Sequence, residues 1–527
     1  MANKRMVVKP WVKYAQKGFI VTAILGVLYY TASISGVLPK NDGSSKIGGL
    51  FGGSNDDDVI VLSTNTFIGF ADWVYMNNGI EPTEDCILYK DYGIKLKILI
   101  QDDFEACRRG LLNGDTHIVY GTLDSYPVEM GEGSEMSDTR FFNISNWSVG
   151  ADAIVCNSKI NTVNDLIGKV VCCSKGTASH TLLLNTLEAS GIGPEMVNDE
   201  NQNYNNKINI KYCESGIEAA KIFRAGQCDA AVVYSPDDED IVSNIRGSKI
   251  LVSTKQASNI ICDGLTAKKE WIEKNKETLK KLIACQLYVH SELNNNPEIA
   301  KKAAKIFSEH YDYTYELALQ SLDKVRFVTL EDEKNFFGLN PEFTGMTGPE
   351  LYSKMARTYA KLNIVKSPLS WNKVSDTSII EELSEDGTVK GDQSAEAFKT
   401  FTAPTKELET AQEMSVKKLS IEFPVGSSIL DNNAKSLIDR EFVSIAKQFS
   451  GARIRIEGNT DATGSDDINI PLSKARAQSV ANYLVNEYGF DRNRFIVIGN
   501  GSKKAKTDGV VGANHAYRTT DFELINE

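Results

Sequence analysis

A run of small polar residues stands between a β-branched stretch and an apolar stretch of the chain. Residues 174–180 read Ser-Lys-Gly-Thr-Ala-Ser-His and precede a helical pattern that begins at Leu182. Backbone N–H groups and hydroxyls at a helix N-terminus attract anions, because the helix dipole is positive there. The run therefore suits a small oxyanion or a carboxylate, although ordinary helix capping by Thr177 or Ser179 explains it equally well. Its candidate ligand-binding residues are Gly176, Thr177, Ser179 and His180, the last as a ligand or a capping group.

Polar side chains also follow other predicted strands. Ser63 and Asn65 come at the end of the first β-branched run, and Asp124 follows the third. The carboxyl ends of parallel strands open onto a common crevice in an α/β sheet. These side chains are therefore candidates for orienting a polar ligand. An anion-binding loop combined with an aspartate leaves the charge of that ligand open.

Residue types that would support catalysis or metal binding are scattered. The five histidines do not cluster, and no nucleophile elbow, phosphate-binding loop or C-x-x-C pair occurs. The nine cysteines all lie between Cys86 and Cys285, several of them in apolar runs where a buried thiol behaves as a small hydrophobe. One or two disulfides would also be compatible with an exported domain. We expect no enzyme activity, no cofactor and no metal.

Length and charge limit the classes of protein to consider. A chain of 527 residues exceeds what one hydrophobic core normally supports, so we expect at least two domains. The net charge of -12 argues against nucleic acid as a partner, because phosphate backbones require a basic face.

An uncharged apolar stretch near the start predicts a membrane anchor. Residues 18–38 are long enough to cross a hydrocarbon core of about 30 Å as a helix. Four lysines and one arginine precede this stretch, whereas aspartates are more frequent after it. The asymmetry predicts a single transmembrane helix with residues 1–17 in the cytoplasm and the bulk of the chain on the other side. A cleaved signal peptide is the alternative interpretation.

Four stretches with different patterns follow the predicted anchor. Residues 39–57 are rich in Gly, Ser and Asp, which predicts a flexible stalk. Residues 58–370 alternate β-branched runs with amphipathic helical patterns, as α/β domains with parallel sheets do. Residues 371–415 are polar and predict a linker, part of which could be helical. Residues 416–527 return to alternating strands and helices and predict a smaller α+β domain.

Local phrases in residues 58–370 occur in the same order in a known family. They are Tyr92-Gly-Ile-Lys-Leu-Lys, Gly110-Leu-Leu-Asn-Gly-Asp, the run at 174–180, Arg224-Ala-Gly-Gln-Cys-Asp and Asp263-Gly-Leu-Thr-Ala. This stretch resembles the periplasmic solute-binding proteins of ABC transporters, in particular the nitrate, sulfonate, taurine and thiamine-precursor group.

The resemblance implies a type II-like fold of two lobes that close over a ligand. Lobe one would comprise residues 58–145 and 255–370, and lobe two residues 146–254. The resemblance also places Tyr234 and Asp263 at positions that often face the ligand. Each could instead be a turn or cap residue.

A second set of phrases lies near the C-terminus. It comprises Ile456-Glu-Gly-Asn-Thr-Asp-Ala-Thr-Gly and Asn469-Ile-Pro-Leu-Ser-Lys-Ala-Arg-Ala-Gln-Ser-Val. Residues 416–527 resemble the OmpA-like peptidoglycan-binding domain, which implies binding of the diaminopimelate residue in the stem peptide of the wall. A zwitterionic amino-acid centre needs an acceptor for its ammonium group and a planar donor for its carboxylate. Asp461 and Arg476 are suited to these two roles.

The match to this family is less complete at other positions. Asn469, in the loop before the helix, matches a position that helps to order the site. The family's terminal Asn-Arg-Arg phrase is reduced to Tyr517-Arg518-Thr519, so Arg518 would keep one of two arginine roles and affinity for the wall could be lower. A purely structural ion pair between Asp461 and Arg476 is the alternative.

These expectations combine into one function. The chain is predicted to be a single-pass protein of the bacterial inner membrane with its bulk in the periplasm, tethered to peptidoglycan. It would capture a small polar ligand, an oxyanion among the candidates, for sensing or transport, in association with a membrane protein complex. The alternative is a structural or motor-associated envelope scaffold whose binding-protein domain docks a protein partner. Residues 18–38 hold no ionisable carboxylate, which argues against a proton-conducting motor subunit.

Overall fold

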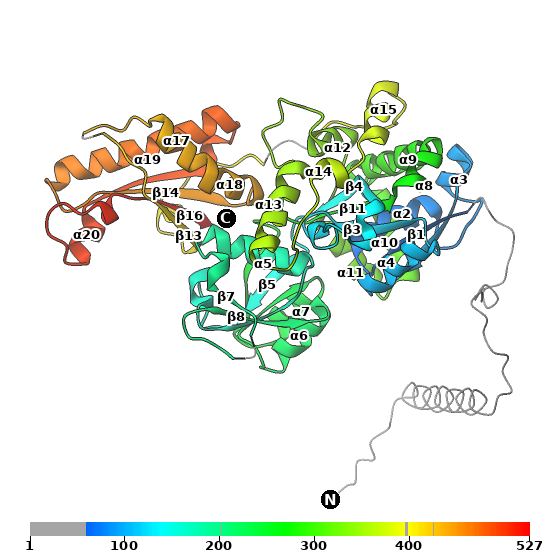
Figure 1. Cartoon of the computed structure of the whole chain (residues 1–527), viewed down its shortest axis with the longest axis horizontal. Helices are drawn as coiled ribbons and strands as arrows, with labels where there is room; N and C mark the ends of the chain where they lie inside the picture. The colour runs from blue at the N-terminus through cyan, green and yellow to red at the C-terminus, as the bar shows by residue number, and fades with distance from the viewer. Residues whose placement is uncertain (1–58, 201, 396–398, 425, 527) are drawn as a thin grey trace, which may run out of the picture. The chain divides into compact units, whose positions relative to one another are not determined.

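The computed structural model describes residues 59–200, 202–395, 399–424 and 426–526 (Figure 1). The predicted cytoplasmic tail, membrane helix and stalk lie outside these residues. Among the described residues, no helix is long and apolar enough to cross a membrane.

The first sheet has six strands in the order β12-β4-β11-β3-β1-β2. Strands β1, β2 and β3 run parallel, whereas β11 is antiparallel to both β3 and β4. The strands are β1 (Val59–Thr64), β2 (Lys95–Ile100), β3 (Ile118–Thr122), β4 (Thr139–Ser148), β11 (Cys262–Lys268) and β12 (Val325–Phe327). The helices around it include α2 (Ala71–Asn77), α3 (Ile87–Tyr92), α4 (Phe104–Asn113), α8 (Lys269–Lys274), α9 (Lys276–Asn295), α10 (Pro297–His310) and α11 (Tyr315–Leu322).

The second sheet repeats this arrangement in the order β10-β5-β9-β6-β8-β7. Here β6, β8 and β9 are parallel, and β5 is antiparallel to β9. The strands are β5 (Asp152–Cys156), β6 (Val170–Ser174), β7 (Val197–Asn198), β8 (Ile208–Cys213), β9 (Ala230–Tyr234) and β10 (Lys249–Ser253), with helices α5 (Ala178–Ala189), α6 (Gly216–Arg224) and α7 (Asp237–Asn244). In both sheets, the antiparallel strand enters from the other lobe. This topology confirms the two-lobed α/β fold predicted from the sequence.

Two chain crossings join the lobes, and their polar groups are tied together. The Ser148 hydroxyl lies 2.7 Å from an Asp152 carboxylate oxygen and 2.8 Å from the Thr254 hydroxyl. The Thr254 hydroxyl in turn accepts hydrogen bonds from the backbone N–H groups of Gly150 and Asp152. Gly150 has φ of 146°, a conformation that side chains with a Cβ rarely adopt. The crossings therefore form one hydrogen-bonded hinge.

Burial agrees with the expectation that most cysteines are core thiols. All nine cysteines are free, and seven of them are buried. The remaining two, Cys213 and Cys228, are half-buried in lobe two.

The first part of the interval predicted as a linker, residues 371–386, is largely helical and follows two helices of lobe one. Helices α12 (Leu330–Phe337), α13 (Gly348–Lys361), α14 (Trp371–Val374) and α15 (Ser378–Asp386) extend lobe one. Buried side chains Ile379, Ile380 and Leu383 hold α15 in place, and Gln393 donates to the carbonyl of Leu287 in α9. Residues 371–386 therefore belong to lobe one, because their apolar face is buried in its core.

The C-terminal domain is a four-stranded sheet in the order β13-β16-β14-β15. Its elements are β13 (Glu413–Leu419), α17 (Asn432–Ile438), α18 (Ser444–Gln448), β14 (Arg453–Asn459), α19 (Asp466–Tyr488), β15 (Phe495–Gly501), α20 (Lys503–Thr507) and β16 (Thr520–Ile525). Helix α19 lies very close to the sheet, since a Cβ added at Gly458 would be 2.1 Å from the carbonyl oxygen of Ser473. Only a glycine permits this approach.

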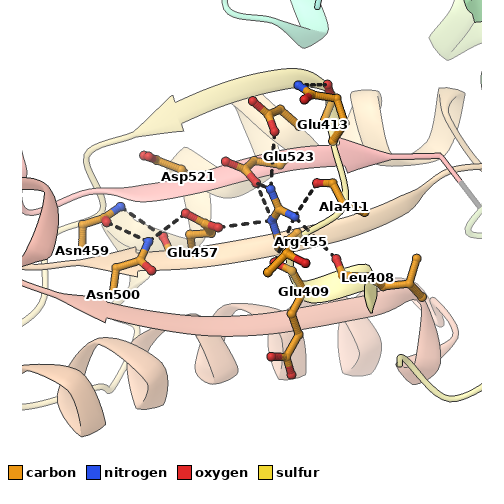
Figure 2. A network of polar contacts seen from close by, with 12 residues as sticks. Leu408, Glu409, Ala411, Glu413, Arg455, Glu457, Asn459, Asn500, Asp521 and Glu523 are labelled. Atoms are coloured by element: carbon orange, nitrogen blue, oxygen red, sulfur yellow. Dashed lines mark hydrogen bonds and ion pairs between the residues drawn. The ribbon is translucent and has the colours of Figure 1, made fainter. Parts of the chain in front are cut away.

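A buried arginine attaches the chain before β13 to this sheet (Figure 2). Arg455 of β14 bonds Glu523 of β16 at 2.6 Å and donates to the carbonyl oxygens of Glu409 and Ala411 at 3.1 and 2.9 Å. Burial raises the pKa of Glu523 to about 7, and the nearby Glu457 carboxylate adds to this rise while Arg455 opposes it. The guanidinium therefore joins three segments of the domain.

Replacing Arg455 with methionine should lower the free energy of unfolding of the C-terminal domain by about 3–5 kcal/mol. The change leaves the buried Glu523 carboxylate and several carbonyls without their charged donor. Protection of the β13, β14 and β16 amides against hydrogen exchange measures this loss. The exposed Arg440, which pairs with its neighbour Glu441, supplies a matched control as Arg440→Met. Unchanged protection in the Arg455 variant would contradict the prediction.

Candidate functional site

The edge where β3 ends and β11 begins faces lobe two. A Cβ added to Gly176 of lobe two would lie 3.1 Å from Cγ1 of Val128, which follows β3 in lobe one. A cavity of 30 Å³ is lined by Tyr120, Thr122 and Ser125 from lobe one and by Gly176 and Thr177 from lobe two. The predicted ligand-binding loop therefore lies at the boundary between the lobes, which is closed to a space the size of a few water molecules.

The predicted anion-binding loop makes internal hydrogen bonds. The N–H of Gly176 donates to Nδ1 of His180 at 3.3 Å, and the Thr177 hydroxyl donates to the carbonyl of Ser174 at 3.0 Å. Burial, assisted by Lys175, lowers the pKa of His180 to about 3, so its ring is neutral and can accept this bond. Ser179 is buried in the first turn of α5. The His180 ring therefore accepts a hydrogen bond from within the loop that precedes α5.

The polar residues at the end of β1 differ in availability. The Ser63 hydroxyl contacts Sγ of Cys107 in α4 at 3.4 Å, so it takes part in packing within lobe one. Asn65 is half-buried, and its Oδ1 has no hydrogen-bond partner among the described residues. Of these two predicted ligand residues, Asn65 keeps a free acceptor.

Three aspartates occupy the edges of the two sheets where the lobes meet. Asp124 follows β3, Asp263 is the second residue of β11, and Asp152 begins β5. Their exposed fractions are 0%, 6% and 7%. Burial raises the pKa of Asp124 to about 7 and that of Asp152 to about 6. Burial raises the pKa of Asp263 well above its ordinary value, and Asp152 and Asp124 add to the rise.

Tyr234 ends β9 and pairs with Asp152 across the β5–β9 ladder. Its ring packs on Gly216, where an added Cβ would lie 2.8 Å from the ring. Burial raises the pKa of its hydroxyl, and Asp102 of lobe one adds to this effect. Tyr234 is therefore within electrostatic range of the opposite lobe, as a cleft residue would be.

In the C-terminal domain, Asp461 is the centre of a second polar site. It lies in the loop between β14 and α19 and is 3% exposed. Its Oδ2 accepts from Nε of Arg518 at 2.8 Å and from the backbone N–H of Asn514, while its Oδ1 accepts from the N–H of Thr463. Burial opposes ionisation, but the bonds from Thr463 and Arg518 outweigh it and hold the pKa of Asp461 below its usual value. The carboxylate is therefore ionised at neutral pH.

Arg476 lies beside this carboxylate without pairing with it. Its Nε donates to the carbonyl of Ser427 at 3.0 Å, and its guanidinium stands 4.9 Å from the centre of the Phe423 ring. Burial and the charge of Arg518 lower the pKa of Arg476, whereas Asp461 raises it. The ion pair of this site is thus Asp461–Arg518, and not the Asp461–Arg476 pair considered as an alternative.

Asn469 lies in the first turn of α19, and not in the loop before it as predicted. Its Nδ2 donates to the carbonyl of Thr463 at 2.9 Å, which closes the loop that carries Asp461. The structure therefore brings together all four residues predicted for this site: Asp461, Asn469, Arg476 and Arg518.

Residues 422–518 match the OmpA family. The chain therefore joins a two-lobed α/β fold to a C-terminal domain that matches the OmpA family. Over 111 residues it is 30% identical to outer membrane porin F of Pseudomonas aeruginosa, covering 21% of this chain and 31% of that one. Over 66 residues it is 42% identical to the peptidoglycan-binding protein ArfA of Mycobacterium tuberculosis, covering 11% of this chain and 20% of that one. The chain thus spans about a third or less of these relatives.

Solved structures similar to the chain include binding proteins and one enzyme. The periplasmic aliphatic sulphonate-binding protein SsuA of Escherichia coli has a TM-score of 0.47 and 16% identity, covering 62% of this chain and 99% of that one. A putative sulfonate-binding SsuA of Methylobacillus flagellatus has a TM-score of 0.47 and 14% identity, covering 65% and 98%. The desulfurization enzyme DSZB has a TM-score of 0.44 and 10% identity, covering 63% and 99%.

Asp152 was not predicted from the sequence, although it joins the two aspartates that were. It stands directly before the apolar run Ala153–Val155, and the start of a strand is a common place for a polar residue. The antiparallel pairing of β5 with β9 in lobe two is what places Asp152 at the edge of the sheet, and the sequence does not indicate this pairing.

Replacing Asp124 with asparagine should stabilise the protein above pH 7. In the folded protein the carboxyl has a pKa of about 7, against about 3.9 when unfolded, so the folded state retains its proton longer. In the unmodified protein, Asp124 therefore lowers the free energy of unfolding as the pH rises. This loss is absent below pH 4, grows by about 1.4 kcal/mol per pH unit between pH 4 and 7, and is complete above pH 7. The titratable group that acts on Asp124 is Asp152, and Asp124 in turn raises the pKa values of Asp263, Cys262 and Tyr359.

Urea unfolding at pH 5 and pH 8, followed by tryptophan fluorescence, measures the effect. The tryptophans of the described residues, Trp73, Trp147, Trp271 and Trp371, lie in lobe one or its helical extension. The free energy of unfolding of the Asp124→Asn variant should rise relative to that of the unmodified protein as the pH increases. An exposed aspartate of lobe one, changed as Asp85→Asn, controls for the loss of a charge. A variant that is less stable at pH 8 would show that Asp124 has a stabilising partner.

Proposed function

We propose that this chain captures a small polar solute between its two lobes while its OmpA domain holds it at the cell wall. The observation that carries the proposal is the grouping of an ionised carboxylate, Asp461, with two guanidinium groups in the OmpA domain. Capture, rather than chemical conversion, accounts for a cleft lined by unpaired polar groups. The captured solute would serve transport or sensing, in association with a membrane protein complex.

The wall-binding part of the proposal follows from complementary charges. Diaminopimelate presents an ammonium and a carboxylate on one carbon. Asp461 would accept the ammonium, and Arg476 would bind the carboxylate, because its guanidinium is held by a carbonyl and an aromatic ring and has no carboxylate partner among the described residues. The relative named as a peptidoglycan-binding protein matches within this domain.

Anchoring in the inner membrane is supported by the sequence alone. Residues 18–38 provide an uncharged stretch of sufficient length, and the basic residues before it favour a cytoplasmic N-terminus. The chain would then be held at both the membrane and the wall. Recovery of a variant lacking residues 18–38 in the membrane fraction would contradict this placement.

Peptidoglycan binding should fall at least tenfold in Asp461→Asn and in Arg476→Met. Each change removes one partner of a charge-assisted contact with the stem peptide. Co-sedimentation of the purified protein with isolated peptidoglycan gives the measurement, and free diaminopimelate should compete. Asp467→Asn and Arg492→Met serve as matched controls, because both residues are exposed side chains of the same domain that lie outside the site. Equal sedimentation of all variants would contradict the assignment of the site.

A solute should raise the melting temperature of the full-length protein. The panel comprises nitrate, phosphate, sulfonates, phosphonates, amino acids, polyamines and thiamine precursors. At 100 times its dissociation constant a ligand adds about 2.7 kcal/mol, which corresponds to roughly 5 °C for a domain of this size. The shift should disappear in Asp263→Asn. If no compound shifts the melting temperature, the scaffold interpretation replaces solute capture.

A further inference from the structure

The cleft holds an excess of negative charge that the protein itself does not balance. Asp124 and Asp263 come from lobe one and Asp152 from lobe two, and the three carboxylates are close enough to repel one another. Neither carboxylate oxygen of Asp124 makes a hydrogen bond of normal geometry among the described residues, although the Thr181 hydroxyl lies near enough to oppose the rise of its pKa. Asp152 has one partner, the hydroxyl of Ser148. A buried carboxylate normally has a cation or several donors beside it.

Cationic side chains near the cleft are committed to other carboxylates. Lys324 lies 2.7 Å from Glu239, Arg108 lies 2.6 Å from Glu129, and Lys175 lies 3.7 Å from Asp199. None of the three acts on the pKa of Asp152 or Asp263. Lys324, Arg108 and Lys175 therefore leave the carboxyl groups of Asp124, Asp152 and Asp263 without a cationic partner.

A further polar group points to a ligand beside these carboxylates. The Tyr120 hydroxyl is buried without a partner, although its side chain is only 5% exposed. In the β3–β11 ladder Thr122 pairs with Asp263, so Tyr120, two residues earlier in β3, lies on the same face as Asp263. Tyr120 also lines the cavity between the lobes. Burial raises the pKa of Tyr120, and Asp263 adds to the rise, so the phenol and the carboxylate are close neighbours.

An oxyanion fits this environment poorly. The Gly176 amide, a donor of the predicted anion loop, is already bonded to the neutral His180 ring. The hydroxyl of Thr181, in the first turn of α5, acts on Asp124, so a carboxylate of the protein stands where that helix would attract an anion. A second anion there would be repelled by Asp124 and by Asp263.

The outer part of the cleft is acidic and aromatic as well. Asp102 of lobe one and Asp237 of lobe two both raise the pKa of Tyr313, after burial itself, and both act on Tyr234. Carboxylates beside aromatic rings are typical of sites for organic ammonium groups. Among the described residues, no group of three His, Cys, Asp or Glu side chains is arranged to hold a metal ion.

We propose that the cleft binds an organic cation with one or more primary amines, and not an oxyanion. The proposal rests on the solute-capture function and specifies the ligand class for the same cleft. The ammonium group would lie between Asp124 and Asp263 of lobe one and Asp152 of lobe two. Closure of the hinge would then be favoured, because the cation removes the repulsion between the carboxylates of opposite lobes.

Titration of the full-length protein with putrescine and spermidine, by calorimetry, tests this directly. Both amines should bind, whereas phosphate and methanesulfonate should not. Asp124→Asn and Asp263→Asn should each weaken amine binding at least tenfold, and the exposed Asp85→Asn should leave it unchanged. Affinity should rise from pH 5 to pH 8, because the carboxylates must lose their protons to pair with the ammonium group. Melting curves of each variant show that it is folded.

The outcomes separate the two proposals. Binding of phosphate, a sulfonate or a neutral solute without binding of amines would overturn the amine proposal and leave solute capture intact. Amine binding that is unaffected by both asparagine variants would also overturn it. If no compound of either charge binds to the folded protein, both proposals fail and the domain is a scaffold.

Discussion

Two strands that cross between the lobes determine the geometry on which the function depends. After the chain crosses from lobe one to lobe two, β5 pairs antiparallel to β9. After it crosses back from lobe two to lobe one, β11 pairs antiparallel to β3. Each crossing strand therefore begins at the edge where the lobes meet. This is why Asp152 and Asp263, separated by more than a hundred residues, stand together there. The Thr254 hydroxyl ties the two crossings, so a movement of one must involve the other.

The buried carboxylates at this edge lower the stability of the folded protein when they are ionised. Buried acids without counter-charges either keep their protons or lower stability, and both effects depend on pH. Such a cost is typical of functional sites, because it is relieved only when the ligand is present. In this chain the cost is shared between the lobes, so a cation would link ligand binding to closure. The same reasoning explains why the loop at 174–180, which has the composition of an anion site, uses its groups internally.

The OmpA domain shows a different balance, because its buried charges at Arg455 and Asp461 have partners of opposite charge. Arg455 pairs with Glu523 and binds the backbone that enters the domain, and Asp461 pairs with Arg518. The close approach of α19 to the sheet at Gly458 fixes the start of that helix relative to the Asp461 loop. A rigid loop of this kind presents the carboxylate and Arg476 at constant separation. That property suits the recognition of a small zwitterion on a large polymer.

Local pattern was sufficient to predict the two-lobed α/β fold and the OmpA domain, whereas the ligand-binding roles of the residues at Asp461 stay predictions. These features follow from short segments of sequence. They depend on the periods of strands and helices, and on polar residues at fixed spacing within a loop and the helix after it. The span at 18–38 stays a prediction, since it lies outside the described residues. Partners were decided by the tertiary structure. Asp461 pairs with Arg518, which lies 57 positions later in the sequence, and not with Arg476, which is nearer in the sequence. Residues 371–386 pack on lobe one although their composition resembles a linker, and Asp152 joins Asp124 and Asp263 only through the strand crossing. Pairing between residues so far apart in the sequence depends on which segments the fold brings side by side. No short segment of sequence contains that information.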